Sequence, residues 1–383
     1  MNHKHLQWVE IRRPAMAHNI TQFRRLVGAK CKLMAVVKAN AYGHGSIEVS
    51  RIALEAGAEW LGVNSAEEGI HLRRSGVRAP ILILGYVGLR ELDEVVGHDL
   101  RLIVYNDETV ERLAARCRKL GRQARVHIKV ETGTHRQGVA SQKLLQFIRR
   151  IKRHRELILE GLSSHFANIE DTTDHFYPQL QLGLFKSVNR LLRANRISIP
   201  IKHMSCTAST ILFPQTYHDM VRVGIGLYGL WPSKETYLSC LMQKREPLRL
   251  EPVLAWKTRI AQIKHVPKDS LVGYGCTYKT TRDSRLAVVP VGYYDGYARS
   301  LSNASYVLIR GRRAALRGRV AMDFLMADIT DIRGAGIEDE VTLIGRDGTE
   351  RITADYLASL AGTINYEIVT RINPNVPRVV VET

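Results

Sequence analysis

The sequence lacks a hydrophobic run of about 20 residues, the length that a membrane-spanning helix needs. Residues 1–13 are basic but contain no apolar core of the kind found in secretory signals. Its five cysteines are scattered, with no Cys-x-x-Cys pair and no His/Cys cluster at the spacing of metal ligands. These absences predict a cytoplasmic protein with free thiols, no disulfide framework and no bound metal.

Acidic and aromatic residues are also few. The chain has 56 Lys and Arg against 37 Asp and Glu, a net charge of +19, and only 7% aromatic residues. The densest basic runs, 149–155 and 310–319, contain no aromatic side chain, and the first continues a helical pattern. Nucleic-acid binders interleave aromatic and basic residues or carry a recognised motif. We therefore interpret these runs as solvated faces and predict no specific nucleic-acid partner; retention on DNA at physiological salt would test the alternative.

Short apolar runs alternate with amphipathic stretches up to about residue 230, in a chain of 383 residues that is long enough for two domains. Runs that predict strands are 33–37, 60–63, 81–84, 101–104, 126–130, 159–163, 201–204 and 220–223. Two of the helices between them are predicted to begin at the N-caps Asp107 and Ser141. Eight such alternations suit a closed parallel (β/α)8 TIM barrel, although an open doubly wound sheet gives the same pattern.

Reactive side chains follow several of these runs, and this placement favours the barrel. They are Lys38, Lys129, His165, Thr207, Arg222 and Gly224. Barrel enzymes build their sites at the carboxyl ends of the strands, with phosphate in the loops after the last two. Here those loops, 207–210 and 224–226, offer hydroxyl and backbone N–H groups.

The character of the sequence changes after Trp231 and Pro232. The following runs are short and β-rich, and a single clear helix is predicted at 354–361. The predicted strands of this part are 253–263, 286–291, 306–309, 327–330 and 340–344. We predict a barrel domain at 10–245 and a mainly β domain at 246–383, with residues 1–9 as a candidate to pack with the second.

The most informative stretch is 35–45, Ala-Val-Val-Lys-Ala-Asn-Ala-Tyr-Gly-His-Gly. Lys38 emerges at the carboxyl end of the first predicted strand. A partly desolvated lysine has a lowered pKa and can form a Schiff base with a carbonyl cofactor. Gly43 and Gly45 allow the backbone to approach a bound group closely. Alone, such a lysine would be only a charge at the rim of a strand.

The string around Lys38 resembles the pyridoxal 5'-phosphate (PLP) lysine motif of alanine racemases, and further strings resemble that family in the same order. They are 129–138, 164–167, 222–229, 273–275, 292–297, 320–323 and 363–367. The resemblance implies a PLP enzyme of fold type III with a barrel, a β domain and a head-to-tail homodimer. It also implies interconversion of L- and D-alanine, an isomerase activity that supplies D-alanine for peptidoglycan.

By the same resemblance, two residues exchange the α-proton on opposite faces of the substrate. Lys38 holds the cofactor and is the base on one face, while Tyr274 of the partner subunit is the base on the other. Arg222 would face the pyridine nitrogen with support from His165. A guanidinium stays protonated and keeps that nitrogen unprotonated, which suits a racemase because it limits drift into transamination.

The resemblance also implies residues that hold the substrate and the cofactor phosphate. Arg136 and the backbone N–H of Met322 from the partner subunit would meet the substrate carboxylate. Lys129 matches a lysine that is carbamylated in many family members; as an anion it would hold Arg136, and an unmodified lysine is the alternative. The residues expected to contact the phosphate are Tyr42, Thr207, Gly224, Ile225 and Tyr366.

Two segments depart from the family's pattern. Residues 203–208 read His-Met-Ser-Cys-Thr-Ala where the family usually shows His-x-Ala-Asn-Ser-Ala, so Cys206 replaces an asparagine. The loop after Lys129 has Glu131, Thr134 and His135 where the family more often has an aspartate and smaller residues. The first change is expected to affect how tightly the cofactor is bound, and the second the orientation of Arg136.

Two rival activities remain open at this point. A racemase of the same fold could act on serine or a basic amino acid, because one methylene in a pocket is worth only about 1–3 kcal/mol. A fold-type III decarboxylase would be expected to pair the pyridine nitrogen with a carboxylate, which Arg222 argues against. Release of carbon dioxide would separate the two reactions.

Overall fold

The computed structural model describes residues 4–382, which form two compact units. One unit consists of residues 15–41 and 46–251. The other contains, among the described residues, 4–14, 42–45 and 252–382. Compactness alone does not show that either unit folds independently, so the predicted domain boundary at residues 245 and 246 stays a prediction.

The first unit is built on eight parallel strands in the order β8-β7-β6-β5-β4-β3-β2-β9. The strands are β2 (Lys32–Val36), β3 (Trp60–Val63), β4 (Ile81–Ile83), β5 (Arg101–Val104), β6 (Ala124–Lys129), β7 (Leu157–Ser163), β8 (Ile201–His203) and β9 (Met220–Val223). Between the two end strands, the Asp219 N–H donates to the Lys202 carbonyl at 3.0 Å and the Arg222 N–H to the Ser205 carbonyl at 3.1 Å. These bonds bring the sheet nearly to closure. The predicted barrel is confirmed, and the open sheet is excluded.

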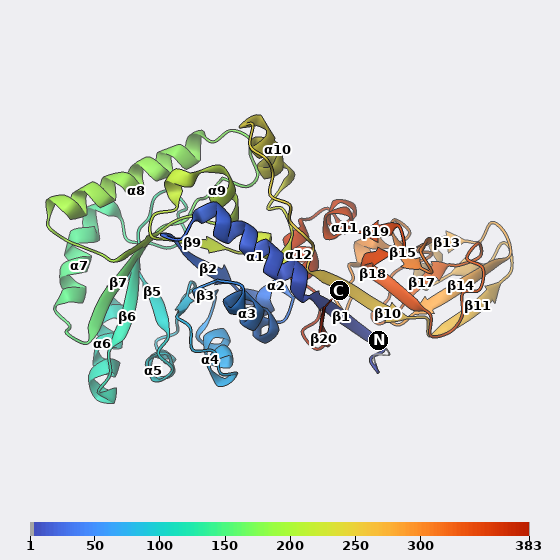
Figure 1. Cartoon of the computed structure of the whole chain (residues 1–383). Helices are drawn as coiled ribbons and strands as arrows, with labels where there is room; N and C mark the ends of the chain where they lie inside the picture. Colours follow the sequence, from blue (N-terminus) through green and yellow to red (C-terminus); the bar gives the residue numbers. More distant parts are fainter. Residues whose placement is uncertain (1–3, 383) are drawn as a thin grey trace. The chain divides into compact units, whose positions relative to one another are not determined.

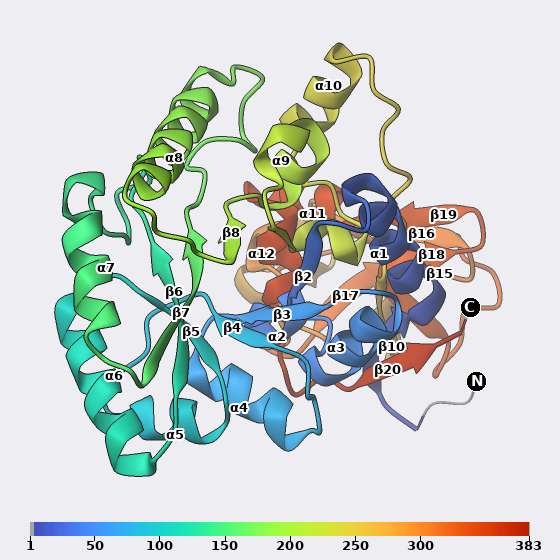
Figure 2. The same cartoon turned by 60° about the vertical axis from the view of Figure 1, so that its left-hand side comes forward.

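Helices accompany the strands, and Figures 1 and 2 show α4 to α8 on the outer side of the sheet. The helices are α1 (Arg13–Val27), α2 (Lys38–Tyr42), α3 (Ser46–Glu55), α4 (Ala66–Arg74), α5 (Leu92–Gly97), α6 (Asp107–Leu120), α7 (Leu144–Lys152), α8 (Phe176–Ala194), α9 (Thr207–Leu212) and α10 (Lys234–Met242). On α7, the apolar residues 144, 147, 148 and 151 are buried, as a 3.6-residue period requires. Arg149 and Lys152 are exposed on this helix, as expected for a solvated basic face.

Both predicted helix caps are wrong, by one and by two residues. The N-cap of α6 is Asn106, whose extended backbone lets its side-chain oxygen accept from the Thr109 N–H at 2.8 Å, so Asp107 lies inside the first turn. Ser141 makes no capping bond and instead begins a 3₁₀ turn, Ser141–Lys143, before α7. Asn106 and Asp107 are both good cap residues, so the sequence does not show which of them is the cap. It also does not show that a 3₁₀ turn precedes α7.

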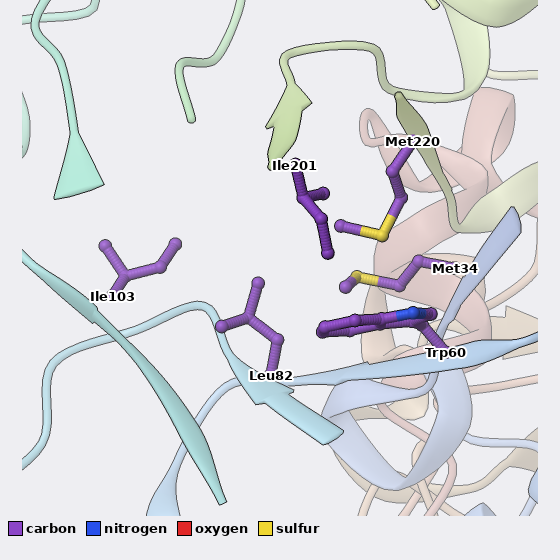
Figure 3. Close-up of a cluster of buried hydrophobic side chains, with 6 residues drawn as sticks. All are labelled: Met34, Trp60, Leu82, Ile103, Ile201 and Met220. Atoms are coloured by element: carbon purple, nitrogen blue, oxygen red, sulfur yellow. The ribbon is translucent and has the colours of Figure 1, made fainter. Parts of the chain in front are cut away.

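An apolar cluster draws one side chain from each of six barrel strands (Figure 3). It consists of Met34, Trp60, Leu82, Ile103, Ile201 and Met220. Three of them, Trp60, Ile201 and Met220, are the first residues of their strands. Side chains alternate along a strand, so the next residues on the same face lie two positions further toward the carboxyl end.

The second unit contains a seven-stranded sheet in the order β16-β15-β18-β10-β1-β20, with β19 paired to β18. Two smaller sheets, β11-β14-β17 and β12-β13, belong to the same unit. The strands are β1 (Gln7–Arg12), β10 (Leu254–Arg259), β11 (Gln262–Val266), β12 (Leu271–Val272), β13 (Tyr278–Lys279), β14 (Ser284–Val289), β15 (Tyr306–Ile309), β16 (Arg312–Ala315), β17 (Leu325–Asp328), β18 (Glu340–Asp347), β19 (Glu350–Ile352) and β20 (Arg378–Val381). The prediction of a mainly β carboxyl-terminal part is confirmed.

Several details of this unit differ from or extend the predictions. The run 253–263 forms two strands, β10 and β11, instead of one. The predicted helix is present as α11 (Ala354–Ala361), but a second, α12 (Asn365–Thr370), was missed because it has six residues and no side-chain cap. Strand β1 pairs with β10 and β20, while residues 1–3 of the predicted segment 1–9 lie outside the described residues. No helix within residues 4–382 has the length and apolarity needed to cross a membrane.

Candidate functional site

Lys38 lies at the carboxyl end of β2, as predicted, and opens an unusual turn. The four residues after it, Ala39 to Tyr42, all have φ between 52° and 53°, in the left-handed region. For L-residues this conformation costs about 1–2 kcal/mol per residue. Side chains and backbone groups must therefore hold it in place, and strain of this kind is typical of functional sites.

One carboxylate secures the start of this turn. Glu68 accepts the N–H of Ala39 at 2.6 Å through one oxygen and the N–H of Asn64 at 2.6 Å through the other. Later in the turn the Asn40 side chain accepts the N–H of Ser46 at 2.9 Å. Glu68, on α4, thus ties the backbone of the residue after Lys38 to the residue that follows β3.

The environment of Lys38 disfavours its charged form. Burial is the largest cause of the lowered pKa of Lys38. The Arg136 guanidinium lowers this pKa further, against smaller opposing effects of Glu68 and Glu170. A lysine with a lowered pKa has a larger neutral fraction at physiological pH, and the neutral amine is the nucleophile and base. Lys38 thus has the environment that carbonyl chemistry needs.

Lys129 ends β6 and is 6% exposed. Burial lowers the pKa of Lys129 to about 8, with Arg222 and Arg136 contributing. Its Nζ donates to Gln137 Oε1 at 3.3 Å. Lys38, Lys129, Arg136 and Arg222 therefore form a group of mutually repelling cations, a setting that attracts anionic ligands.

Arg136 lies on the loop 131–138, which is exposed at that residue. Backbone bonds close the loop, from the Glu131 N–H to the Val139 carbonyl at 3.0 Å and from the Val139 N–H to the Lys129 carbonyl at 2.8 Å. Glu131 Oε1 accepts the N–H groups of Gly133 and Thr134 at 2.5 and 2.7 Å. The glutamate that departs from the family pattern therefore serves to hold the loop that carries Arg136.

Arg222 is 7% exposed and has no carboxylate partner among residues 4–382. Its NH1 donates to His203 Nδ1 at 2.6 Å. Its NH2 donates to the Ser164 carbonyl at 2.9 Å, the Met204 carbonyl at 3.2 Å and His165 Nδ1 at 3.2 Å. Burial lowers the pKa of Arg222 to about 10, so it remains a cation at neutral pH.

A chain of hydrogen bonds runs from Arg222 through the barrel. A guanidinium only donates, so His203 accepts at Nδ1 and its Nε2–H donates to His127 Nδ1 at 2.8 Å. His127 Nε2–H then donates to Glu160 Oε2 at 3.1 Å. Burial lowers the pKa of both histidines, which keeps them neutral and makes this direction consistent. The chain ends on a carboxylate that also lies 3.3 Å from Arg101.

His165 follows β7, and the structure places it beside Arg222 as the sequence predicted. Because Nδ1 accepts from Arg222, the ring carries its proton on Nε2. Burial holds the pKa of His165 well below its usual range, with Arg222 adding to the effect. His165 is therefore a neutral ring whose lone pair is used by the arginine.

The two loops predicted to hold phosphate are joined to each other. Thr207 Oγ accepts the N–H of Gly224 at 3.0 Å, which brings α9 against the turn after β9. A Cβ on Gly226 would lie 2.6 Å from Phe23 and 2.7 Å from Thr207, so this turn tolerates no larger residue. Ile225, between the two glycines, begins a short 3₁₀ turn, Ile225–Tyr228. The residues expected from the barrel therefore do lie together.

Cys206 immediately precedes Thr207 and is a protonated thiol. Burial raises the pKa of Cys206 to about 11, with Glu170 contributing. Its backbone N–H donates to Ser209 Oγ at 2.7 Å, and its Sγ lies 3.8 Å from Glu170 Oε1. Ser209 thereby satisfies the backbone at the start of α9, and Cys206 supplies no strong side-chain donor where an asparagine would.

Tyr42 and Tyr366, the two predicted phosphate contacts of the second unit, also lie near each other. Their ring centroids are 6.1 Å apart. Next to Tyr42, a Cβ on Gly43 would lie 2.0 Å from the Val369 carbonyl oxygen, and Arg378 Nε donates to the Gly43 carbonyl at 3.0 Å. Gly43 thus lets α12 approach its backbone closely, and its approach to a bound group stays a prediction.

Tyr274 and Met322 are displayed on the surface of the second unit. Tyr274 is 75% exposed, between Gly273 and Gly275, which both have positive φ, and Met322 is 53% exposed. The Met322 N–H makes no hydrogen bond within the described part of the chain. A phenol and a free backbone donor are therefore both available to another molecule.

Four residues of this network were not predicted from the sequence: His203, His127, Glu160 and Glu68. The two histidines carried a weak signal, because His127 interrupts an apolar strand and His203 lies two positions after the inward Ile201. Glu160 lies within β7, where its role depends on the partner strand. Glu68 gave none, because its function arises from contacts with residues 29 positions and 4 positions away.

Comparison with known proteins agrees with this geometry. Residues 11–232 match the model of the alanine racemase N-terminal domain, and residues 253–380 match that of the C-terminal domain. An alanine racemase of Methanococcus maripaludis is 41% identical over 98% of both chains, and one of Halothermothrix orenii is 43% identical over 97% of this chain and 96% of the other.

Solved structures lead to the same family. The alanine racemase of Bacillus anthracis, with bound L-Ala-P, superposes with a TM-score of 0.92 at 34% identity, covering 100% of this chain and 96% of that one. A histidine racemase of Leuconostoc mesenteroides gives 0.89 at 28% identity, covering 99% and 98%. Matches to both domain models and full-length relatives above 40% identity show that this chain belongs to the alanine racemase family.

Proposed function

We propose that this chain is an alanine racemase that uses PLP to interconvert L- and D-alanine. Enzymes of the family depend on PLP. The observation that carries the proposal is the pairing of two cations in one barrel: Lys38, whose pKa burial and Arg136 lower, and Arg222, which is buried without a carboxylate. A hydrolase or a metal enzyme needs neither feature.

The donor set fits the proposed cofactor. Thr207, Gly224 and Ile225 from the barrel, with Tyr42 and Tyr366, would hold the phosphate, and Lys38 would hold the aldehyde carbon. A buried guanidinium without a counter-charge is unfavourable, and an acceptor such as a pyridine nitrogen would satisfy it. When bound, PLP would supply the electron sink that makes the α-hydrogen of the amino acid acidic.

Lys38 and Tyr274 would be the two bases. A neutral Lys38 amine takes or returns the α-proton on one face, and its lowered pKa keeps part of it unprotonated. The Tyr274 phenol would do so on the other face. Arg222, which only donates, would leave the acceptor that it contacts unprotonated. Arg136 and the Met322 N–H would orient the substrate carboxylate.

We also propose that Lys129 is carbamylated. Only the neutral amine reacts with carbon dioxide, forming an N–C bond and releasing one proton, and the pKa of about 8 gives Lys129 a substantial neutral fraction. The product is an anion that would turn the repulsion between Lys129 and Arg136 into a charge-assisted pair. Intact mass under non-denaturing conditions should show one added carbon dioxide, and a mass without it would contradict the proposal.

A homodimer with shared sites would bring Tyr274 and Met322 to a second barrel. Supporting this, the second unit exposes Tyr274 and Met322 themselves and, close to Met322, the large side chains Tyr293, Tyr294 and Phe324. Such a concentration is typical of an interface. Mixing inactive Lys38→Ala and Tyr274→Phe chains should restore about a quarter of the wild-type sites, because half of the random dimers contain one intact site. Absence of any recovery would contradict shared sites.

The test of the activity is direct. Purified protein should show the visible absorbance of bound PLP and convert L-alanine into D-alanine, and Lys38→Ala should lose both. Serine, lysine, arginine and histidine are the comparison substrates, because a histidine racemase shares the fold. If the protein shows the absorbance but does not convert alanine, the proposal of PLP as cofactor stands and the proposal of alanine as substrate is wrong. Carbon dioxide release from alanine would indicate a decarboxylase.

A further inference from the structure

A cavity of about 760 Å³ lies at the other end of the barrel, where β8 and β9 begin. Its walls come from the second half of α8, the connection 195–200 and the residues just before β9. None of the residues discussed above for cofactor or substrate lines it. The volume is in the range of about 300–1,000 Å³ that is typical of small-molecule sites.

The lining is strongly cationic. Lys186, Arg193, Arg196 and Lys202 face a single acid, Asp219. Asp219 is already engaged with Lys202, since its Oδ2 accepts the Lys202 N–H at 2.8 Å and lies 3.8 Å from the Nζ. Across residues 4–382, no carboxylate lies within ion-pair distance of Lys186, Arg193 or Arg196. Three cations therefore remain without a counter-charge around one concavity.

Two buried polar atoms of the lining have no partner in the described chain. They are Nε2 of His218 and Oδ1 of Asn189, whose Nδ2 donates to the Phe185 carbonyl at 2.8 Å. Burial lowers the pKa of His218 against an opposing effect of Asp219, with Lys202 and Lys186 contributing, so the ring is neutral. Buried polar atoms are rarely left unpaired. A ligand with both acceptor and donor groups would satisfy them.

The backbone is strained at the same place. Arg196 and His218 have φ of 55° and 49°, in the left-handed region that L-residues rarely adopt. Arg196 takes this conformation in the turn that ends α8, since the Ile197 N–H donates to the Leu192 carbonyl at 2.9 Å.

We propose that this cavity is a second ligand site, which binds a small organic phosphate through Lys186, Arg193 and Arg196 and a hydroxyl group of the ligand through Asn189. Two arginines and a lysine match the several oxygens of a doubly charged tetrahedral anion better than those of a single carboxylate. The lining contains no Phe, Tyr or Trp, whereas sites for single-stranded nucleic acid stack bases on such side chains, so a small molecule is favoured.

The probe is ribose 5-phosphate, titrated calorimetrically into PLP-loaded protein from which free PLP has been removed, at about 0.15 M salt, where exposed charges are screened beyond about 8 Å. PLP saturation fills the other phosphate site. We expect one site per chain. The variant K186Q/R193Q/R196Q should bind at least about tenfold more weakly. The matched variant R149Q/K152Q/R153Q removes the same charge from α7 and its end and should change affinity less than about twofold.

Asn189→Leu tests how the ligand is oriented. It should weaken ribose 5-phosphate severalfold and leave inorganic phosphate unchanged, with the melting temperature as a check on folding. Equal weakening in the two triple variants would overturn the site, because only the general field would be at work. Absence of binding by the wild type, loss of PLP absorbance on titration, or competition by a DNA duplex would also overturn it.

Discussion

The two halves of the barrel interior differ in character, although the same strands build both. The amino-terminal half contains the apolar side chains Met34, Trp60, Ile201 and Met220, with the Arg101 guanidinium 5.3 Å from the centre of the Trp60 ring. Two positions further along the last two of these strands, the same face carries His203 and Arg222. Close packing in the apolar half fixes the strands in position. The same strands therefore hold the cations of the polar half near one another despite their electrostatic repulsion.

The sharpest test of this contrast uses two lysines at opposite ends of one strand. Lys38→Ala should lower turnover by at least about 10³-fold and abolish the visible cofactor band, because it removes a base and the cofactor's attachment. Lys32→Ala, at the start of β2, should retain turnover. The measurements are the racemisation rate and the visible absorbance of both variants. Comparable losses in the two would contradict the prediction that only the carboxyl end of the strand serves the reaction.

Met220→Ala should break the apolar half. Met220 is 0% exposed, so its truncation leaves a cavity next to the strand position of Arg222. We therefore expect a loss of about 2–5 kcal/mol in the free energy of unfolding. Urea denaturation measures it. Met220→Leu, which conserves volume, should cost less than about 1.5 kcal/mol. A stable Met220→Ala protein would show that this half is not tightly packed.

The pKa of Lys129 makes stability depend on pH. In the cofactor-free, unmodified protein the pKa is about 8 instead of 10.5, so between these values the unfolded chain binds more protons. Stability should therefore rise with pH over this window, by on the order of 2 kcal/mol relative to Lys129→Met, which cannot titrate. Urea unfolding at several pH values compares the two proteins. Parallel curves would show that the buried amine is not desolvated.

Glu160→Gln should have the smallest effect. The amide oxygen still accepts from His127, but the negative charge at the end of the chain from Arg222 is lost. We expect turnover to fall only severalfold and its pH profile to shift. The control is Glu156→Gln. Glu156 lies one position before β7 and takes no part in the series of hydrogen bonds from Arg222 to Glu160. An unchanged pH profile in Glu160→Gln would show that the chain positions the rings without transmitting charge.

Regular periodicity made most of the fold predictable. The eight barrel strands follow from short apolar runs, and Lys38, Lys129 and Arg222 follow from their place at strand ends. Asn106 and α12 were missed because adjacent cap-forming residues or a six-residue helix leave little local signal. His127 and Glu160 gain their roles from the neighbouring strands, and no local pattern encodes a partner 33 or 76 residues away.

The left-handed run after Lys38 has a consequence for chirality. Two of its four residues, Ala39 and Ala41, are L-alanines with φ of 53° and 52°. That region is the mirror image of the helical region favoured by L-residues, and it is therefore the one that a D-alanine favours. Replacing either residue by its D-enantiomer through chemical ligation should relieve about 1–2 kcal/mol of strain without changing a single atom type. The turn beside the proposed cofactor lysine thus discriminates between the two hands of alanine in its own backbone.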